Sequence, residues 1–145
     1  MLDGMVALAT GKASLRGEVL NDLPDRISDV LIFVGVAHSG LCATVSGYWA
    51  AIMALMTAYV GVLGQSVAGR REYGGVMSKP WRIVVLSIGA AITCGLILWG
   101  GERIRWGPIT VLDWACAIII SGSVQTIAVR LKGTFCALAK RADAE

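Results

Sequence analysis

Acidic side chains gather where the first long apolar stretch of the sequence begins. The segment 17–33, GEVLNDLPDRISDVLIF, holds an asparagine and three aspartates: Asn21, Asp22, Asp25 and Asp29. A structural explanation is available, because carboxylates stabilise the positive end of a helix dipole and Pro24 fits the first turn of a helix. A functional explanation requires a wider pattern than these acids alone.

Small and acidic residues upstream extend the cluster into such a pattern. Residues 3–25 read DGMVALATGKASLRGEVLNDLPD, in which Asn21 and Asp25 are four positions apart and share one helical face. The pattern resembles the signature of the CDP-alcohol phosphatidyltransferases, D-x-x-D-G-x-x-A-R-x8-G-x3-D-x3-D. The matching residues are Asp3, Gly4, Ala7, Gly17 and Asp25. A later segment, GGVMSKPWR, resembles a basic loop of bacterial members of this family.

The chain departs from the family signature at three positions. Leu8 stands where the family has arginine, Asn21 stands where it has its third aspartate, and its first aspartate would precede Met1. The six-helix family fold also has about two membrane helices before the signature. We therefore expect an N-terminally truncated member of the family, through a misassigned start codon or as a fragment.

The resemblance implies a metal-dependent reaction at the cytoplasmic membrane surface. In this family the acids bind Mg²⁺ or Mn²⁺, which holds the pyrophosphate of a CDP-linked lipid, and oxygen ligands suit these ions. Carried over by position, Asp3, Asn21 and Asp25 would be metal ligands, and Asp25 would also be the catalytic general base. Asp22 and Asp29 are possible substitute ligands, because Asn21 brings no charge.

The resemblance also implies roles for small and basic residues. Gly4, Ala7 and Gly17 would let the backbone and helices approach the cytidine closely. Lys79 and Arg82 would bind a phosphate of the acceptor alcohol or lipid, or would serve only to set the membrane topology. The implied reaction moves a phosphatidyl group from CDP-diacylglycerol to an alcohol and releases CMP. Glycerol 3-phosphate and an inositol phosphate both remain open as the acceptor.

The elements that position these residues are expected to be apolar helices. The 145-residue chain is 56% hydrophobic and 16% charged, with a mean hydropathy of +0.69, which excludes an ordinary soluble domain. Several stretches approach the length of about 20 residues that crosses a hydrocarbon core. They are 27 to about 44, 47 to about 68, 83–100 and 109–129. The predicted fold is an all-α, polytopic membrane helical bundle in a single domain.

The basic residues predict an orientation in the membrane. With the N-terminal segment inside, eleven Lys and Arg residues fall on the cytoplasmic side and two on the other. We expect a cytoplasmic motif segment at 1–26, four transmembrane helices over 27–130, and a cytoplasmic tail at 131–145. The active site would face the cytoplasm from the inner membrane. The charge of +3 suits anionic lipid headgroups, and no nucleic-acid partner is expected.

Other polar and small residues are given structural roles. His38 is expected at the outer interface, and Asp113 is expected to be an interfacial acid that water reaches. The four cysteines lack metal-ligand spacing and are expected to be small buried side chains. Small-residue faces at 89–91 and 121–123 favour a homodimer.

Two other classes of protein remain open. A small four-helix transporter fits the length and the helix number, but it would need an ionisable group deep in the bundle rather than acids at the surface. A non-catalytic remnant or partner subunit of the phosphatidyltransferase family is favoured by Leu8, Asn21 and the missing first aspartate.

Overall fold

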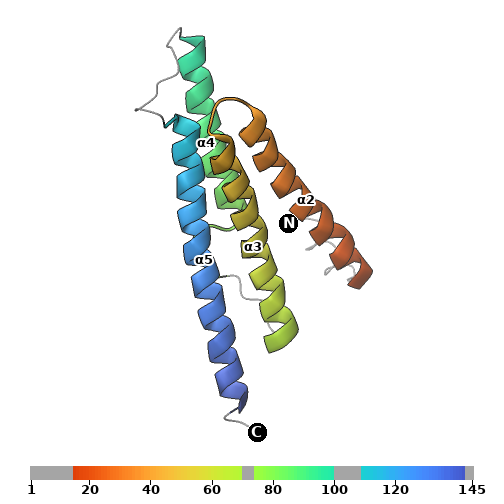
Figure 1. The fold of residues 1–145 in the computed structure, drawn as a ribbon. Coiled ribbons are helices and arrows are strands. Elements are labelled where there is room, and N and C mark those ends of the chain that lie inside the picture. Colours follow the sequence, from red (N-terminus) through yellow and green to blue (C-terminus); the bar gives the residue numbers. More distant parts are fainter. Residues whose placement is uncertain (1–14, 70–73, 100–108, 143–145) are drawn as a thin grey trace.

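The computed structural model describes residues 15–69, 74–99 and 109–142, with the helix but not the side chains of 15–19, 21 and 141. The elements within these ranges are four helices (Figure 1). They are α2 (Leu15–His38), α3 (Thr44–Ala68), α4 (Lys79–Leu98) and α5 (Val111–Ala142). The prediction of an all-α membrane helical bundle is confirmed.

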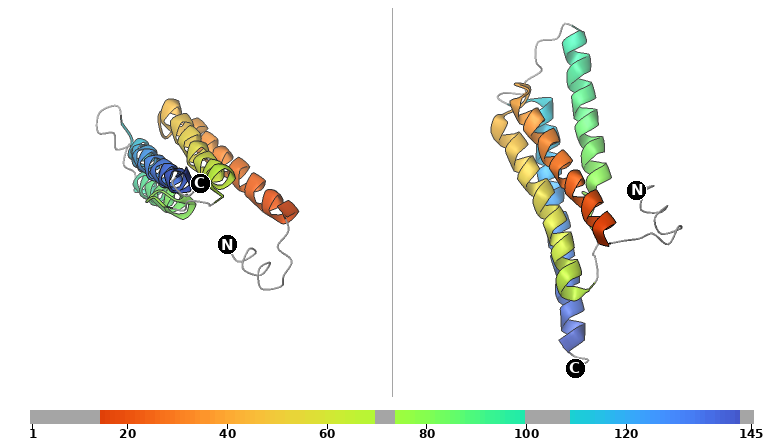
Figure 2. Two further views of the ribbon diagram at one scale, coloured as in Figure 1. Left: turned by 90° about the horizontal axis from the view of Figure 1, so that it is seen from below. Right: turned by 90° about the vertical axis from the view of Figure 1, so that its right-hand side faces the viewer.

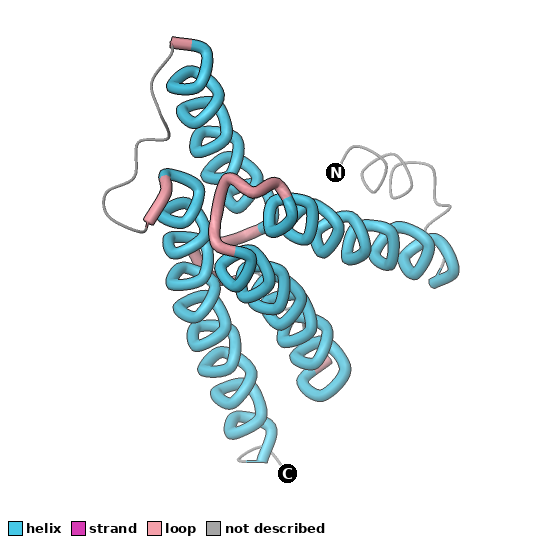
Figure 3. Tube along the Cα trace, turned by 45° about the horizontal axis from the view of Figure 1, so that its top comes forward, coloured by secondary structure: helices cyan, strands magenta, loops and turns pink. Residues whose placement is uncertain are grey.

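The helices do not pack in the order of the sequence. α3 contacts α2 on one side and α5 on the other, and α4 packs against α5. α2 meets α3 near the turn that joins them and then diverges from it, so that the first residues of α2 lie away from the other helices (Figures 2 and 3). The charged half of α2 is therefore the half that separates from α3.

Three of the described helices are long and apolar enough to cross a membrane: Thr44–Ala68, Lys79–Leu98 and Val111–Lys140. α2 contains the first expected span but does not have the same character, because charged residues occur along it from 16 to 29. A membrane crossing by α2 stays a prediction.

Small residues bring α2 and α3 into close contact. The buried face of α3 consists largely of Gly, Ala and Thr, and Gly47 lies so close to Ala37 of α2 that an added Cβ would be 2.7 Å from the Ala37 Cβ. In lipid, where hydrophobic burial provides little drive between helices, such close van der Waals packing stabilises a helix pair. Gly47 therefore sets how closely the two helices approach.

Three small residues expected to face a second copy pack inside the chain instead. A Cβ on Gly89 would lie 2.9 Å from the Ala115 side chain, and one on Gly122 would lie 2.6 Å from Cε of Met77. Ser123 is fully buried. These positions hold α4 and the link before it against α5. A homodimer stays a prediction, and these three residues no longer support it.

Asp113 is a buried helix cap and not a water-exposed acid, contrary to the sequence prediction. It is 8% exposed, and its carboxylate accepts hydrogen bonds from the backbone N–H groups of Thr110 (2.9 Å) and Ala43 (2.8 Å). Because Ala43 precedes α3 and Thr110 precedes α5, one side chain caps both helices. Unpaired N–H groups at a helix start favour such a carboxylate.

The cysteines are less buried than predicted. Only Cys116 is fully buried, Cys42 is partly buried, and Cys94 and Cys136 are exposed on the helix surfaces. Burial, with a smaller contribution from the Asp113 carboxylate, raises the pKa of the Cys42 thiol. His38 is exposed at the end of α2, with Nε2 3.2 Å from the hydroxyl of Tyr48, and its place at the outer interface stays a prediction.

Candidate functional site

Part of the predicted site lies within the described residues. Asp25, Lys79 and Arg82 have described side chains. Asp3, Gly4 and Ala7 lie outside the described residues, and Gly17 and Asn21 belong to the part of α2 where only the helix is described. Of the predicted site residues, the structure therefore shows the side-chain surroundings of Asp25, Lys79 and Arg82.

Two acids of α2 meet two cations of α4. Lys79 Nζ lies 2.9 Å from Asp25 Oδ1, and Arg82 Nη2 lies 2.9 Å from Asp29 Oδ2. Lys79 Nζ is also 3.8 Å from Asp29 Oδ1. Residues four apart on α2 and three apart on α4 each lie on one helical face, so the four charges form a single group. We call Asp25, Asp29, Lys79 and Arg82 the charge cluster.

The charge cluster has a buried half and an accessible half. Arg82 and Asp29 are 3% and 4% exposed, whereas the side chains of Lys79 and Asp25 are 29% and 48% exposed. Arg82 Nη1 donates a hydrogen bond to the carbonyl of Ala54 on α3 at 3.1 Å. A buried ion pair persists only when both partners are paired and hydrogen-bonded, so Asp29 and Arg82 depend on each other.

One donor in the buried half has no partner among the described residues. The Nε–H of Arg82 is buried and makes no hydrogen bond there. Buried donors of this kind are rare in folded proteins, and they are often found where a water or a ligand binds. The cluster thus keeps one hydrogen-bonding position available on its most buried cation.

The local sequence explains why the two cations lie at the start of α4. Ser78 has an extended backbone conformation and Pro80 occupies the first turn, so the helix begins at Lys79. Lys79 and Arg82 are thus added to the positive end of a helix dipole, which is unfavourable for cations and favourable for an anion. The carboxylates of α2 offset this positive charge in the structure.

The role of Asp29 was missed at the level of sequence, where it was considered only as a substitute metal ligand. Its carboxylate accepts a hydrogen bond from Nη2 of Arg82 at 2.9 Å. The available signal was an aspartate one turn beyond Asp25, placed inside an apolar run, with an arginine at the start of a later span. Asp22, the other possible substitute, forms an ion pair with Arg26 of its own helix at 3.0 Å.

The metal site expected from the motif is not assembled by the described side chains. Within residues 15–69, 74–99 and 109–142, no group of three or more His, Cys, Asp or Glu residues comes together. Asp25 is the one member of the expected metal set with a described side chain, and its oxygen contacts Lys79. Binding of Mg²⁺ or Mn²⁺ stays a prediction.

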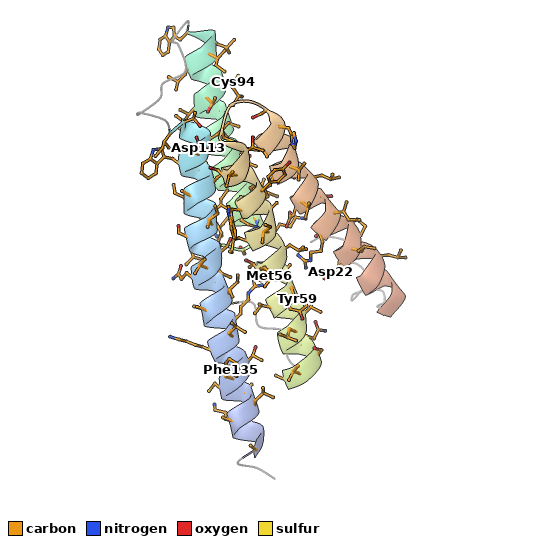
Figure 4. All side chains as sticks on the ribbon, in the orientation of Figure 1. Asp22, Met56, Tyr59, Cys94, Asp113 and Phe135 are labelled. Atoms are coloured by element: carbon orange, nitrogen blue, oxygen red, sulfur yellow. The ribbon has the colours of Figure 1, made fainter. Side chains whose placement is uncertain are left out.

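A groove opens beside the charge cluster where α2 and α3 diverge. It has a volume of about 580 Å³, and Figure 4 labels three residues around it, Asp22, Met56 and Tyr59. Its other lining residues are Leu23, Arg26, Leu55, Ala58 and Val62. An apolar groove of this size can hold a lipid chain or a helix.

The chain is similar to two curated proteins, although no protein-family model matches it. It is 30% identical over 137 residues to the phosphatidylinositol phosphate synthase of Mycobacteroides abscessus, in a match covering 90% of this chain and 57% of that protein. It is 30% identical over 113 residues to the archaetidylinositol phosphate synthase of Pyrococcus horikoshii, covering 78% of this chain and 56% of that protein.

Both relatives are CDP-alcohol phosphatidyltransferases. The resemblance inferred from residues 3–25 is therefore confirmed, and the chain is related to that family. The chain spans somewhat more than half the length of these relatives.

Proposed function

We propose that the protein containing this chain transfers a phosphatidyl group from CDP-diacylglycerol to a phosphorylated alcohol and releases CMP. Both relatives are named as synthases of inositol phosphate lipids. Of the two acceptors left open by the sequence, we therefore propose an inositol phosphate rather than glycerol 3-phosphate. The relatives also favour a transferase over the small transporter considered from the sequence.

The contact between Asp25 and Lys79 is the observation that carries this proposal. The signature assigns proton removal to Asp25, and the later basic loop makes Lys79 a candidate for phosphate binding. The charged atoms of these two side chains are 2.9 Å apart. A general base and an anchor for the same acceptor must both reach that molecule, so they must lie close together. The buried Nε–H of Arg82, which has no hydrogen-bond partner among the described residues, would add a donor for the same phosphate.

In the proposed reaction, Asp25 takes the proton from a hydroxyl of the acceptor. The hydroxyl oxygen then forms a bond to the lipid-linked phosphorus of CDP-diacylglycerol. The bond from that phosphorus to the oxygen of CMP breaks, and CMP leaves with the electron pair. Lys79 and Arg82 hold the acceptor phosphate so that its hydroxyl lies near Asp25.

The charges of the cluster support the need for a divalent cation. Two carboxylates balance two cations, so the cluster by itself has little net attraction for a phosphate. Asp25 with Asp3 and Asn21 would hold Mg²⁺ or Mn²⁺, which when bound supplies positive charge toward the pyrophosphate. The eleven basic residues on one predicted side support a site at the cytoplasmic face of the inner membrane.

The test is CMP release by the purified full-length protein with CDP-diacylglycerol and Mg²⁺. We expect release with inositol phosphate and much less with glycerol 3-phosphate. Asp25→Asn should lower turnover by about 10²- to 10⁴-fold, the usual effect of losing a general base, and should leave the protein folded in detergent. Wild-type turnover in Asp25→Asn would show that the acid marks only a helix start.

A non-catalytic relative is the second candidate, and it is favoured by Leu8 and Asn21. It predicts no CMP release from the wild-type protein with either acceptor. Under the enzymatic proposal, Asn21→Asp should retain or increase turnover, because it restores a charge present in the family signature. The same assay therefore separates the two candidates.

A further inference from the structure

The link between α3 and α4 is hydrogen-bonded to α5. The backbone N–H of Met77 donates to Thr126 Oγ1 at 3.0 Å, and Arg130 Nε donates to the carbonyl of Gly74 at 3.0 Å. Thr126 and Arg130 are four residues apart on α5, so they lie on one face of that helix. This face holds both ends of the segment 74–77.

Close packing supports these hydrogen bonds. Gly75 has a φ of +112°, which favours glycine, and an added Cβ there would overlap the side chain of Thr126. Met77 is only 5% exposed and packs over Gly122. The segment 74–77 therefore lies directly against α5.

Arg130 Nη1 also donates a hydrogen bond to the carbonyl of Thr57 on α3 at 2.7 Å. Gly61 provides the space for this side chain, because an added Cβ would lie 3.1 Å from Arg130 Nη1. One arginine of α5 thus connects α3 with the segment that leads into α4.

The first turn of α4 follows this segment immediately. Lys79 is two residues beyond Met77. The backbone N–H of Arg82 donates a hydrogen bond to the carbonyl of Ser78 at 3.1 Å. A displacement of Met77 therefore moves the backbone that carries both cations of the charge cluster. Arg82 is hydrogen-bonded to Asp29 and Ala54. Within the described part of the chain, the ion-pair contacts of the partly exposed Lys79 are with Asp25 and Asp29 of α2.

We propose that Thr126 and Arg130 are positioning residues that act through the segment 74–77 to place Lys79 for binding the acceptor phosphate. The proposal rests on the proposed function and deepens it. Neither residue touches the acceptor in this scheme. Loosening the segment weakens acceptor binding and leaves the CDP-linked lipid unaffected.

A matched pair of threonines tests the proposal. Thr126 and Thr134 are both buried on α5, and each donates to the carbonyl four residues earlier, at 2.8 and 3.0 Å. Thr126 additionally accepts the Met77 N–H. In the full-length protein, Thr126→Val should raise KM for inositol phosphate about 3- to 10-fold, as expected for one lost hydrogen bond. Thr134→Val should leave it unchanged.

Several readouts distinguish positioning from general damage. KM for CDP-diacylglycerol and kcat should not change in Thr126→Val. In a Lys79→Met background, Thr126→Val should cause no further rise in KM, because the residue it acts through is gone. Arg130→Lys should raise the same KM without changing the other constants. Any of three results would overturn the proposal. They are equal changes in KM for both substrates, equal changes in KM in the two threonine variants, and a full additional rise in KM when Thr126→Val is combined with Lys79→Met.

Binding of inorganic phosphate separates this proposal from the proposed reaction. Isothermal titration of the full-length protein with phosphate requires no turnover. If CMP release is absent but phosphate binds less tightly to Thr126→Val than to Thr134→Val, the reaction is wrong and the positioning stands. If wild type binds no phosphate, or if both variants bind it equally, the positioning is wrong.

Discussion

At the scale of single residues, Asp25 and Asp29 are one turn apart on α2 and have different surroundings. Asp25 is about half exposed and faces the partly exposed side chain of Lys79, whereas Asp29 is buried against Arg82. A partly exposed carboxylate can exchange its partner for a substrate or an ion at modest cost. A buried one cannot, because its partner would remain charged and unpaired.

The two aspartates should therefore separate stability from activity. Asp29→Ala leaves the Arg82 charge buried without a counter-ion, and we expect it to lower the free energy of unfolding by about 3–5 kcal/mol. Asp25→Ala, the matched change one turn earlier, should lower it by less than about 1 kcal/mol, because that pair is exposed. Denaturant unfolding in detergent measures both. Equal losses would show that the burial of the Asp29–Arg82 pair has little energetic weight.

At the scale of elements, the position of α2 depends on its contact with α3. Gly47 and Ala37 meet near the turn, and from there α2 diverges toward its charged half. Because Asp25 and Asp29 are carried by α2, the crossing of these two helices decides whether the acids reach α4. The contact between small residues therefore acts on the charge cluster without being part of it.

Enlarging Gly47 should separate α2 from α3. The added Cβ of Gly47→Ala would lie 2.7 Å from that of Ala37, so the helices must shift, and overpacking of this kind costs about 1–3 kcal/mol. Gly35→Ala on α2 is the control, because no atom lies within 4 Å of its added Cβ. We expect the melting temperature in detergent to fall for Gly47→Ala and to stay level or rise for Gly35→Ala. A fall of equal size in both would contradict close packing at Gly47.

At the scale of the whole molecule, the connections alternate between two ends of the bundle. Asp113 joins the start of α5 to the turn between α2 and α3, and the segment 74–77 lies against α5 further along that helix (Figure 1). Such an arrangement agrees with neighbouring helices that cross the membrane in opposite directions. The distribution of basic residues predicts which of these ends is cytoplasmic.

Labelling from the two sides of the membrane tests this orientation. In a protein without its native cysteines, Ser39→Cys should react with an impermeant maleimide from the outer side, and Ala142→Cys from the cytoplasmic side. Both positions are exposed in the structure. Right-side-out and inverted vesicles provide the two measurements. The reverse accessibility would place the charge cluster on the outer face and remove the cytoplasmic site from the proposal.

Composition and local spacing were enough to predict the class of this protein. Apolar runs of membrane length have few ways to satisfy their backbone groups other than as helices, so composition alone predicts a helical membrane bundle. The spacing of Asp3, Gly4, Ala7, Gly17 and Asp25 indicated the family, which the two relatives confirm. Pro80 marked the start of α4, because proline at the first turn is a local signal.

Which residues become partners depends on how the helices pack in three dimensions. Asp29 and Arg82 are 53 residues apart, and their pairing depends on how α2 crosses the bundle. The inward packing of Gly89 and Gly122 and the capping of two helices by Asp113 likewise depend on the rotation of each helix about its axis. A local pattern identifies a helix and its small or polar positions. It does not encode which neighbour those positions meet, because crossing angle and rotation are set by the packing of all the helices together.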